Sequence, residues 1–359
     1  MKRTRSIITA GVLGLALTLA ACGGGSGDDG DKGGKSDGKI GVILPDTKSS
    51  VRWESADRPA LKAAFEKAGV DYEIQNAEGD ADKMSTIADS MIADGVTVLA
   101  IVNLDSDSGA SIQEKAAKQG VKTIDYDRLT LGGSADYYVS FDNTKVGELQ
   151  GAGLEKCLGD KKSNLIYLNG SPTDNNATLF SKGAHSVLDK NSNYKKVGEQ
   201  AVPDWDNEKA VTIFEQLYTK VDGNVQGVYA ANDGLAGSVI SILQKNGQAG
   251  KVPVTGQDAT VEGLQNILKG DQCMTIYKSA KEEAGALAKA AIALATGKKA
   301  ETNGETEDAT GKRQVPSILL TPKSITKDTV KDVIDDGGAK ASEVCADDFK
   351  KACDEAGIS

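Results

Sequence analysis

The sequence predicts an α/β protein with two doubly wound lobes, each built on a parallel sheet. From Lys39 onward, short apolar runs rich in β-branched residues alternate with amphipathic stretches of helical period. Such alternation gives parallel strands that are buried on both faces and joined by right-handed crossovers. The alternation restarts near residue 142, and each round spans about 110–140 residues, the size of one such lobe.

Each round supplies strands and helices in strict order. The first comprises a strand at 39–44, a helix with Leu61, Ala64, Phe65 and Ala68 facing inward, a strand at 71–75, a helix carrying Met84, Ile87, Met91 and Ile92, and then a strand at 96–102, a helix at about 109–119 and a strand at 121–127. After a strand at 137–142, the second has helices at about 144–158, 176–190, 207–220, 234–246 and 261–269, and strands at 164–170, 196–202, 225–231, 252–257 and 273–278. An Ala-rich helix at about 279–297 and a strand at 317–322 are expected to cross back and complete the sheets.

The first 38 residues have the composition of an export signal and a tether. Cationic residues 2–5 precede an apolar run at 7–21, which is too short to span a membrane as a helix. The run ends in Leu-Ala-Ala-Cys, which resembles the bacterial lipobox, so Cys22 is expected to be lipidated and to become the new N-terminus. The alternative is an ordinary cleaved signal with an incidental cysteine. Residues 23–38 are rich in Gly and Asp, as expected of a flexible linker.

Four cysteines remain after Cys22, an even number in an oxidising compartment. They allow three pairings. Cys345 and Cys353 are neighbours in the tail, which leaves Cys157 and Cys273 for each other. We predict these two disulfides.

The composition argues against nucleic acid, metal and cofactor chemistry. A formal net charge of −10 would repel a nucleic-acid backbone. With one histidine, His185, and no CxxC spacing, a zinc site or a His-based catalytic triad has almost no raw material. No GxGxxG follows the first strand, and neither a P-loop nor a GxSxG motif occurs. No metal or cofactor is expected, and a binding protein is favoured over an enzyme.

Polar and aromatic residues gather where the predicted strands end, which is where open parallel sheets bind ligands. They are Arg52, Trp53, Asp127, Arg128, Asp174 and Asn176 in the loop 171–177, Trp205, Asn232, Asp258 and Lys278. Their charged and amide groups suit the adjacent hydroxyls of a sugar, each of which donates and accepts. The two tryptophans, one in each half, offer flat apolar faces to a pyranose ring.

Most of these positions also have a purely structural interpretation. Trp53 and Trp205 could be core anchors, and Asp127 with Arg128 could form a local surface ion pair. Asn175, Asn176 and Asp258 could cap helices. Asp127, Asp174 and Asp258 could in principle supply a glycosidase pair, but no spacing selects two of them. His185 is expected to have a surface or packing role within a helix.

Six motifs resemble a known family. They are KIGVILPDTKSSVRWES at 39–55, TIDYDRL at 123–129, YYVSFDNTKVGELQG at 137–151, NGSPTDNNATLF at 169–180, VTGQDA at 254–259 and TIYK at 275–278. From about residue 39 to about 335 the chain is similar to the xylose-binding and multiple-sugar-binding proteins of ABC importers. These are periplasmic-type substrate-binding proteins of the ribose/galactose class.

The resemblance implies a type I periplasmic binding protein, with two lobes that are joined by three crossings and close on one aldopyranose. It implies a monomer that delivers the sugar, D-xylose in first place, to a membrane permease. It also implies that the ten strand-end residues contact the sugar, with Trp53 and Trp205 stacking and the other eight hydrogen-bonding. Asp142 and Asn143 would belong to the first crossing and not to the ligand site.

The expected organisation follows from these assignments. Residues 1–21 are a lipoprotein signal, 22–38 the lipidated cysteine and linker, 39–142 with about 279–316 the N-terminal lobe, 143–278 with about 317–340 the C-terminal lobe, and 341–359 a tail. The protein is expected outside the cytoplasm, touching the membrane only through its anchor.

The first loop, PDTKSSVRW, is closer to the multiple-sugar branch, and AANDG at 230–234 is closer to the xylose branch. A broad-specificity protein for glucose, galactose and arabinose is therefore an alternative. A sugar sensor that docks on a signalling receptor and a carbohydrate enzyme are further alternatives. A sugar-responsive repressor would need an N-terminal helix-turn-helix, whose place the export segment occupies.

Overall fold

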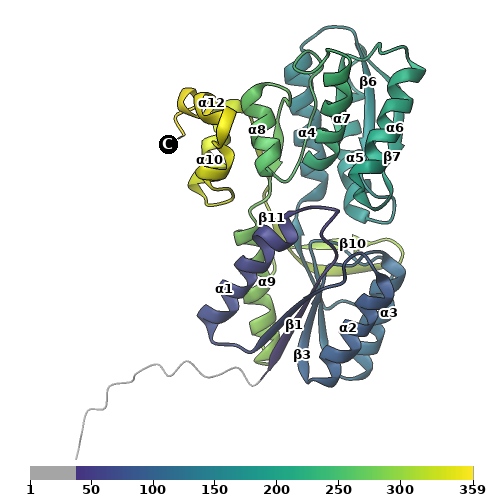
Figure 1. Cartoon of the computed structure of the whole chain (residues 1–359). Helices are drawn as coiled ribbons and strands as arrows, with labels where there is room; N and C mark the ends of the chain where they lie inside the picture. Colours follow the sequence, from purple (N-terminus) through teal and green to yellow (C-terminus); the bar gives the residue numbers. More distant parts are fainter. Residues whose placement is uncertain (1–37, 359) are drawn as a thin grey trace, which may run out of the picture. The chain divides into compact units, whose positions relative to one another are not determined.

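The structure is a computed structural model that describes residues 38–358, and it contains two α/β lobes (Figure 1). The predicted lipid site Cys22 and the predicted signal and linker lie outside the described residues. The sheet of the first lobe has the order β10-β11-β5-β4-β3-β1-β2 and is parallel except for β10. Its strands are β1 (Lys39–Leu44), β2 (Tyr72–Asn76), β3 (Val96–Ile101), β4 (Lys122–Tyr126), β5 (Tyr137–Phe141), β10 (Gly304–Asp308) and β11 (Arg313–Leu320).

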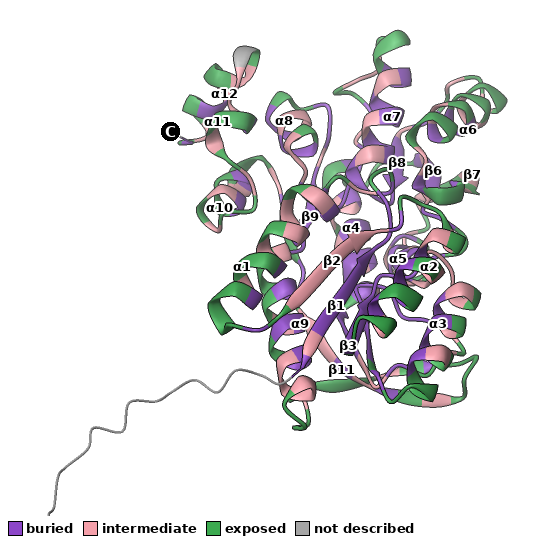
Figure 2. Cartoon of the chain, turned by 60° about the horizontal axis from the view of Figure 1, so that its bottom comes forward, coloured by how far each residue is buried: buried purple, intermediate pink, exposed green. Residues whose placement is uncertain are grey.

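Two pairs of helices cover the two faces of this sheet. They are α1 (Arg58–Ala68) with α9 (Ala280–Ala295), and α2 (Ala81–Ala93) with α3 (Ser106–Lys118). Because side chains alternate along a strand, Val42 and Leu44 of β1 pack in the cluster beneath α1 and α9, whereas Ile43 packs in the cluster beneath α2. Figure 2 shows β1 and β3 buried and the edge strand β2 only half-buried. The predicted double burial is confirmed for the central strands.

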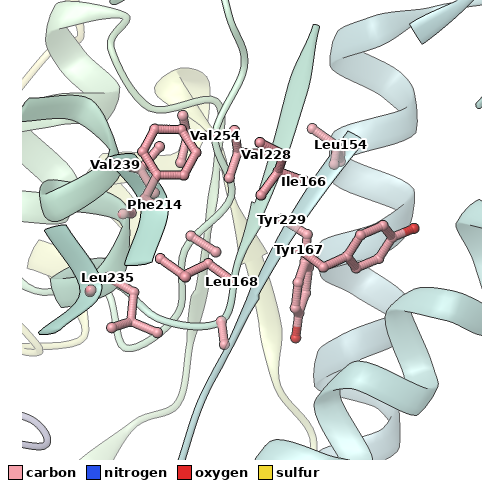
Figure 3. Close-up of a cluster of buried hydrophobic side chains, with 14 of the residues drawn as sticks. Leu154, Ile166, Tyr167, Leu168, Phe214, Val228, Tyr229, Leu235, Val239 and Val254 are labelled. Atoms are coloured by element: carbon pink, nitrogen blue, oxygen red, sulfur yellow. The ribbon is translucent and has the colours of Figure 1, made fainter. Parts of the chain in front are cut away.

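The second lobe is built on the parallel sheet β7-β6-β8, which Val254 extends by one bridge to Val228. Its strands are β6 (Ser163–Asn169), β7 (Tyr194–Ala201), β8 (Gly227–Ala230) and the antiparallel pair β9 (Thr275–Tyr277) and β12 (Lys323–Ile325). Its helices are α4 (Asn143–Leu158), α5 (Asn175–Leu188), α6 (Asn207–Lys220), α7 (Asp233–Lys245), α8 (Val261–Lys269), α10 (Val330–Asp335), α11 (Ala341–Val344) and α12 (Lys350–Glu355). In its core, Leu168 and Val228 pack with Phe214 of α6 and Val239 of α7 (Figure 3).

The chain passes between the lobes three times among the described residues. The passages lie between β5 and α4, between β9 and α9, and between β11 and β12. The N–H of Asp142 in the first passage donates to the carbonyl oxygen of Leu320 in the third, at 2.9 Å. Asp142 also caps α4 by accepting from the N–H of Lys145. The observed architecture is therefore the predicted pair of doubly wound lobes with three crossings.

Two parts of the predicted organisation are wrong. The sequence-based prediction places the strand at 317–322 in the second lobe, but β11 pairs in parallel with β5 in the first. The hairpin between β10 and β11 went unrecognised, and it carries the first lobe as far as Leu320. Residues 341–358 are not a separate tail, because Val344, Cys353 and Ile358 are buried with Leu264 and Ile267 of α8 in the second lobe.

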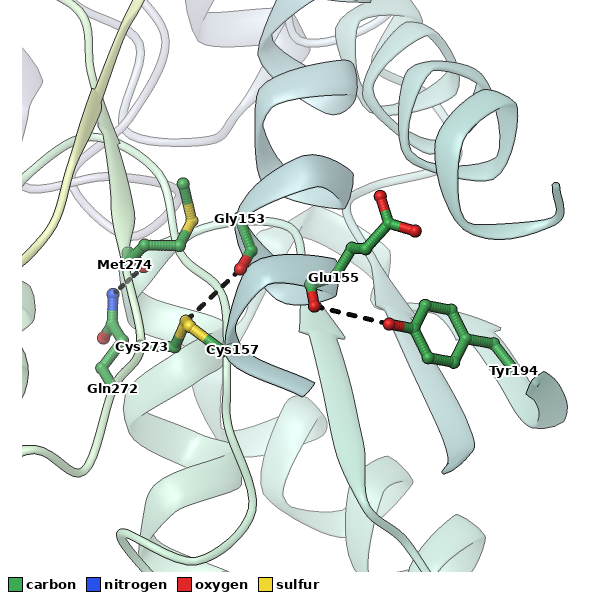
Figure 4. The surroundings of a disulfide bond; sticks show 7 residues. All are labelled: Gly153, Glu155, Cys157, Tyr194, Gln272, Cys273 and Met274. Carbon is green, nitrogen blue, oxygen red and sulfur yellow. Dashed lines mark hydrogen bonds between the residues drawn. A yellow bond between two sulfur atoms is a disulfide. The ribbon is translucent and has the colours of Figure 1, made fainter. Parts of the chain in front are cut away.

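Both disulfides link the pairs that we predicted. Cys157, near the end of α4, is bonded to Cys273, which lies just before β9 (Figure 4). Cys345 is bonded to Cys353 within the C-terminal helices. Within residues 38–358 we find no helix that combines the length and the apolar composition of a membrane span.

The contact between α4 and α5 is close enough to require glycine. A Cβ atom on Gly147 of α4 would overlap the backbone of Phe180 in α5. We predict that Gly147→Ala lowers the free energy of unfolding by about 1–3 kcal/mol, the usual cost of overpacking. Gly285→Ala is the matched control, because a Cβ on this exposed residue of α9 meets nothing, and it should stabilise by about 0.5–1 kcal/mol. Chemical denaturation of both variants measures the difference, and equal stabilities would contradict the prediction.

Candidate functional site

All ten residues predicted from strand ends line one cavity between the lobes. The structure adds Ser49, Ser50, Phe180 and Gln257 to its lining. The first lobe contributes the segment after β1 and the end of β4, and the second contributes the N-termini of α5 and α7 with the loops at Trp205 and Asp258. Lys278 enters from the second crossing. The rule that ligand sites form at the carboxyl ends of parallel strands therefore located this cavity.

Asp127 contacts several of the other residues that line the cavity. Its backbone is left-handed (φ 61°), which ends β4 and lets its N–H donate to the carbonyl of Val139. Its carboxylate accepts from Arg52 Nη1 (3.1 Å) and from Asn176 Nδ2 (3.1 Å), and Lys278 Nζ lies 3.7 Å away. Burial would raise the pKa of Asp127, but Lys278, Arg52 and Arg128 together lower it. The carboxylate is thus held charged while buried.

Arg52 is fixed by the side chains of three acidic residues. Its Nε and Nη2 donate to Asp57 at 2.8 and 2.7 Å, Nη1 donates to Asp127, and Nη2 also donates to Glu283 Oε2 at 2.5 Å. Burial opposes its charge, but these carboxylates raise the pKa of Arg52 well above its usual value. The guanidinium lies 4.5 Å from the ring centroid of Trp53, a cation–π distance. Arg52 therefore holds both a carboxylate and an indole of the site in place.

Arg128 forms the corresponding pair with the second lobe. Its Nε lies 3.0 Å from Asp174 Oδ2, and its Nη2 donates to Ser49 Oγ at 3.2 Å. Asp174 caps α5 through the N–H of Asn176 and accepts from Trp205 Nε1 at 3.1 Å. Burial raises the pKa of Asp174, against the attraction of Arg128. The alternative of a local ion pair between Asp127 and Arg128 is wrong, since each pairs with a residue distant in sequence.

Asp258 and Lys278 form another ion pair of the cavity lining. Lys278 Nζ lies 3.5 Å from Asp258 Oδ1, and Ser50 Oγ donates to Asp258 Oδ2 at 3.1 Å, from the other lobe. Asn232 caps α7 with its oxygen, while its Nδ2 donates to the carbonyl of Ser49 at 3.2 Å. Thr260, not Asp258, caps α8. The alternative that Asp258 caps a helix is therefore wrong. Asn232 both caps α7 and lines the cavity.

Polar atoms that lack a hydrogen-bond partner within the described part of the chain remain in the cavity wall. They are Gln257 Oε1, Arg128 Nε, which nevertheless lies in an ion pair 3.0 Å from Asp174 Oδ2, and Asp258 Oδ1, which lies 3.5 Å from Lys278 Nζ. Buried polar atoms are normally paired, so a donor and two acceptors around one cavity indicate a ligand that both donates and accepts. The apolar walls come from Trp53, Trp205 and Phe180. Such a mixture fits a polyhydroxylated ring with C–H faces.

The cavity is small in this arrangement of the lobes. Its free volume is about 30 Å³, room for one or a few water molecules. Pockets for small ligands usually measure about 300–1,000 Å³. A sugar therefore enters only if the lobes separate or the side chains across the cavity move apart.

The structure also contains site residues that sequence reasoning missed. Ser49 and Ser50 lie in the loop after β1, Gln257 precedes Asp258, and Phe180 lies one turn into α5. All four lie within the quoted motifs, but the sequence-based prediction did not select them as ligand-site residues. Asp57 and Glu283 lie behind Arg52, and no local pattern distinguishes them from ordinary helix residues.

Asn143 lies at the first crossing, as expected, and does not line the cavity. Its Nδ2 nevertheless donates to Asn176 Oδ1 at 2.8 Å, so it orients a lining residue. His185 stacks on Tyr167 and lies 3.0 Å from both Asp189 and Glu199, in the packing role expected of it. Among residues 38–358, no three metal-ligating side chains are grouped as a metal site.

Two parallel-sheet lobes, three crossings and a polar cavity between them define a two-lobe solute-binding protein. Residues 40–299 match the family described as the periplasmic binding protein domain, and the chain belongs to this family. It has the type I fold that the sequence motifs implied.

Several relatives are similar over most of their length. The D-xylose-binding periplasmic protein of Escherichia coli is 36% identical over 310 residues, which cover 85% of this chain and 92% of that protein. The multiple sugar-binding periplasmic receptor of Rhizobium radiobacter is 32% identical over 94% of this chain and 98% of its own. A carbohydrate transporter solute binding protein from Chloroflexus aurantiacus, solved with D-glucose, has a TM-score of 0.78 at 28% identity over 85% of this chain and 97% of that chain. These are binding proteins, and this chain is one too, not an enzyme.

The buried acid Glu283 should make stability depend on pH. Burial raises the pKa of Glu283 to about 8, despite the attraction of Arg52. An unfolded glutamate titrates near pH 4.3, so the folded state binds the extra proton, and stability falls as pH rises between about 4 and about 8. Glu283→Gln keeps an acceptor for Arg52 and removes this titration. Its melting temperature should therefore decrease less than that of the unmodified protein between about pH 5 and about pH 8.

The matched control is Glu282→Gln, because Glu282 is the exposed neighbour of Glu283. It should follow the pH profile of the unmodified protein. Asp125 and Asp233, whose pKa values burial raises to about 7, are present in every variant and do not affect the comparison. If Glu283→Gln and the unmodified protein have parallel profiles, Glu283 does not titrate in this range.

Proposed function

We propose that this chain binds a monosaccharide in its interlobe cavity and delivers it to the permease of an ABC importer. The observation that carries the proposal is the cavity itself, where ion pairs from both lobes surround donor and acceptor atoms that make no hydrogen bond within the described residues. The two relatives above are named for binding D-xylose and multiple sugars, at 36% and 32% identity. The ligand that we favour is an aldopyranose, D-xylose in first place.

In this proposal the lining residues have distinct roles. Arg128 Nε would donate to a sugar hydroxyl, while Asp258 Oδ1 and Gln257 Oε1 would accept. Asn232 and Lys278 would add donors after giving up part of their present contacts. Trp205 would supply a stacking face. The guanidinium near Trp53 leaves this indole less free to stack, so we assign it to the wall of the site, beside Arg52.

A broad-specificity monosaccharide protein is the second candidate. The multiple sugar-binding receptor matches 98% of its own length, and the solved protein from Chloroflexus aurantiacus holds D-glucose. A role as a sugar sensor that docks on a signalling receptor is compatible with the same cavity. Anchoring by lipidated Cys22 outside the cytoplasm, together with a monomeric state, completes the proposal.

Isothermal titration calorimetry tests the ligand. The protein is refolded to remove carried-over sugar and titrated with D-xylose, D-glucose, D-galactose, L-arabinose and D-ribose. Binding of D-xylose alone supports the first candidate, and comparable binding of several pyranoses supports the second. If no sugar binds, the proposed ligand class is wrong.

We predict that Asp258→Ala weakens sugar binding while the protein still folds. Asp258 Oδ1 is buried and accepts no hydrogen bond from the described part of the chain, and removing the side chain also takes from Lys278 its nearest cavity carboxylate, 3.5 Å away. The loss of a charged hydrogen-bond partner should raise the dissociation constant by roughly 10- to 100-fold, about 1–3 kcal/mol. Asp204→Asn is the control, because Asp204 is adjacent to Trp205 but exposed and paired with Lys209. Calorimetry should show an unchanged dissociation constant for the control, and an unchanged value for Asp258→Ala would refute the role.

A further inference from the structure

The C-terminal module, which we define as residues 326–358, packs against the second lobe beside the binding site. Figure 1 shows α10 and α12 next to α8. The module shares a buried apolar cluster with α8, and the disulfide between Cys345 and Cys353 lies within it. The same cluster contains Ala259, the residue after Asp258, and Tyr277, the residue before Lys278. The module therefore supports the wall of the cavity from behind.

One carboxylate of the module contacts the second crossing directly. Asp336, at the C-terminal cap of α10, accepts from the hydroxyl of Tyr277 at 2.7 Å and from Ser279 Oγ at 3.0 Å, both through Oδ2. These donors flank Lys278, whose ammonium lies between Asp127 and Asp258 in the cavity. Asp336 thus holds the crossing on both sides of a cavity residue that it does not touch.

The contact extends into the first lobe through α9. Ser279 caps this helix, since its Oγ accepts from the N–H of Glu282 at 3.4 Å. One residue further, Glu283 accepts from Arg52 Nη2. The hydrogen bond from Tyr277 lowers the pKa of Asp336, so its carboxylate is charged where it accepts these bonds. A chain of contacts therefore links the module to cations of the site on both sides of the crossing.

We propose that Asp336 is a positioning residue for the ligand site, which fixes the second crossing through Tyr277 and Ser279 and so places Lys278 in the cavity. The proposal rests on the proposed sugar-binding function and deepens it. According to this proposal, the C-terminal module affects ligand affinity as well as stability. If the module were only a structural cap, substituting Asp336 would change the free energy of unfolding but not the affinity for the sugar.

The test compares the dissociation constant for D-xylose, or for whichever monosaccharide the unmodified protein binds, with that of Asp336→Ala. The variant should bind roughly fivefold more weakly, because Asp336 acts on the ligand only through the position of Lys278. Tyr277→Phe, which removes one donor and keeps the ring, should weaken binding in the same direction. Because the bond that Tyr277→Phe removes is one of the two that Asp336→Ala removes, the double variant should be less impaired than the sum of the single effects.

Asp335→Ala is the matched control within the same helix. Asp335 is exposed, and its carboxylate accepts hydrogen bonds from Lys331 Nζ. It should bind sugar like the unmodified protein. Hydrogen exchange of the backbone amides at 275–280 gives a second readout that needs no ligand. Exchange there should be faster in Asp336→Ala and unchanged in Asp335→Ala.

Unmodified affinity in both Asp336→Ala and Tyr277→Phe would overturn the proposal and leave the module as a structural cap. If the unmodified protein binds no monosaccharide, the proposed function fails by itself, and hydrogen exchange then decides the positioning role. Faster exchange at 275–280 in Asp336→Ala would support it, and unchanged exchange would overturn it.

Discussion

The buried carboxylate of Asp127 is the group on which the arrangement of both lobes depends. Its side chain and carbonyl oxygen accept from Arg52 of the first lobe and Asn176 of the second, and Lys278 of a crossing lies near it. A charge buried this deeply is tolerated only while its partners remain in place. The partners are placed in turn by Asp57, Glu283 and Asn143. The cavity is therefore one electrostatic unit, not a collection of separate contacts.

The sequence was sufficient to locate this unit but not to complete it. The alternation of apolar runs and amphipathic stretches identified the two lobes, and the residues after each strand included ten that line the cavity. This works because parallel strands bring their carboxyl ends to one edge, whatever the loops do. Ser49 and Ser50 escaped because their roles depend on the conformation of a loop that has no periodic pattern. The sequence-based prediction missed Glu283 because its partner, Arg52, is distant in the chain.

The errors of organisation have the same physical origin. The strand β10 is mostly exposed, so the polar sequence at 304–308 lacks the apolar run that identifies the central strands. Because the apolar run is missing, the sequence pattern does not predict the hairpin that returns β11 to the first sheet. The sequence-based prediction therefore places β11 in the other lobe. The C-terminal helices are short, and their apolar residues form a recognisable core only where they pack against α8. The positions of these elements depend on contacts between residues distant in the chain, which a local sequence pattern does not reveal.

The hydrogen bonds across the cavity bear on how a ligand would be selected. Ser50 donates to one oxygen of Asp258 and Asn232 donates to the carbonyl of Ser49, so the loop after β1 is tied to the second lobe by its own polar groups. A hydroxyl that enters must either donate to Asp258 Oδ1, which accepts no hydrogen bond within residues 38–358 and lies 3.5 Å from Lys278 Nζ, or displace Ser50. Only the difference between new and displaced hydrogen bonds contributes to affinity. A sugar whose hydroxyls match the unpaired atoms keeps the tie between the lobes, whereas one that displaces Ser50 loses it. Selection among similar sugars would therefore depend on this loop.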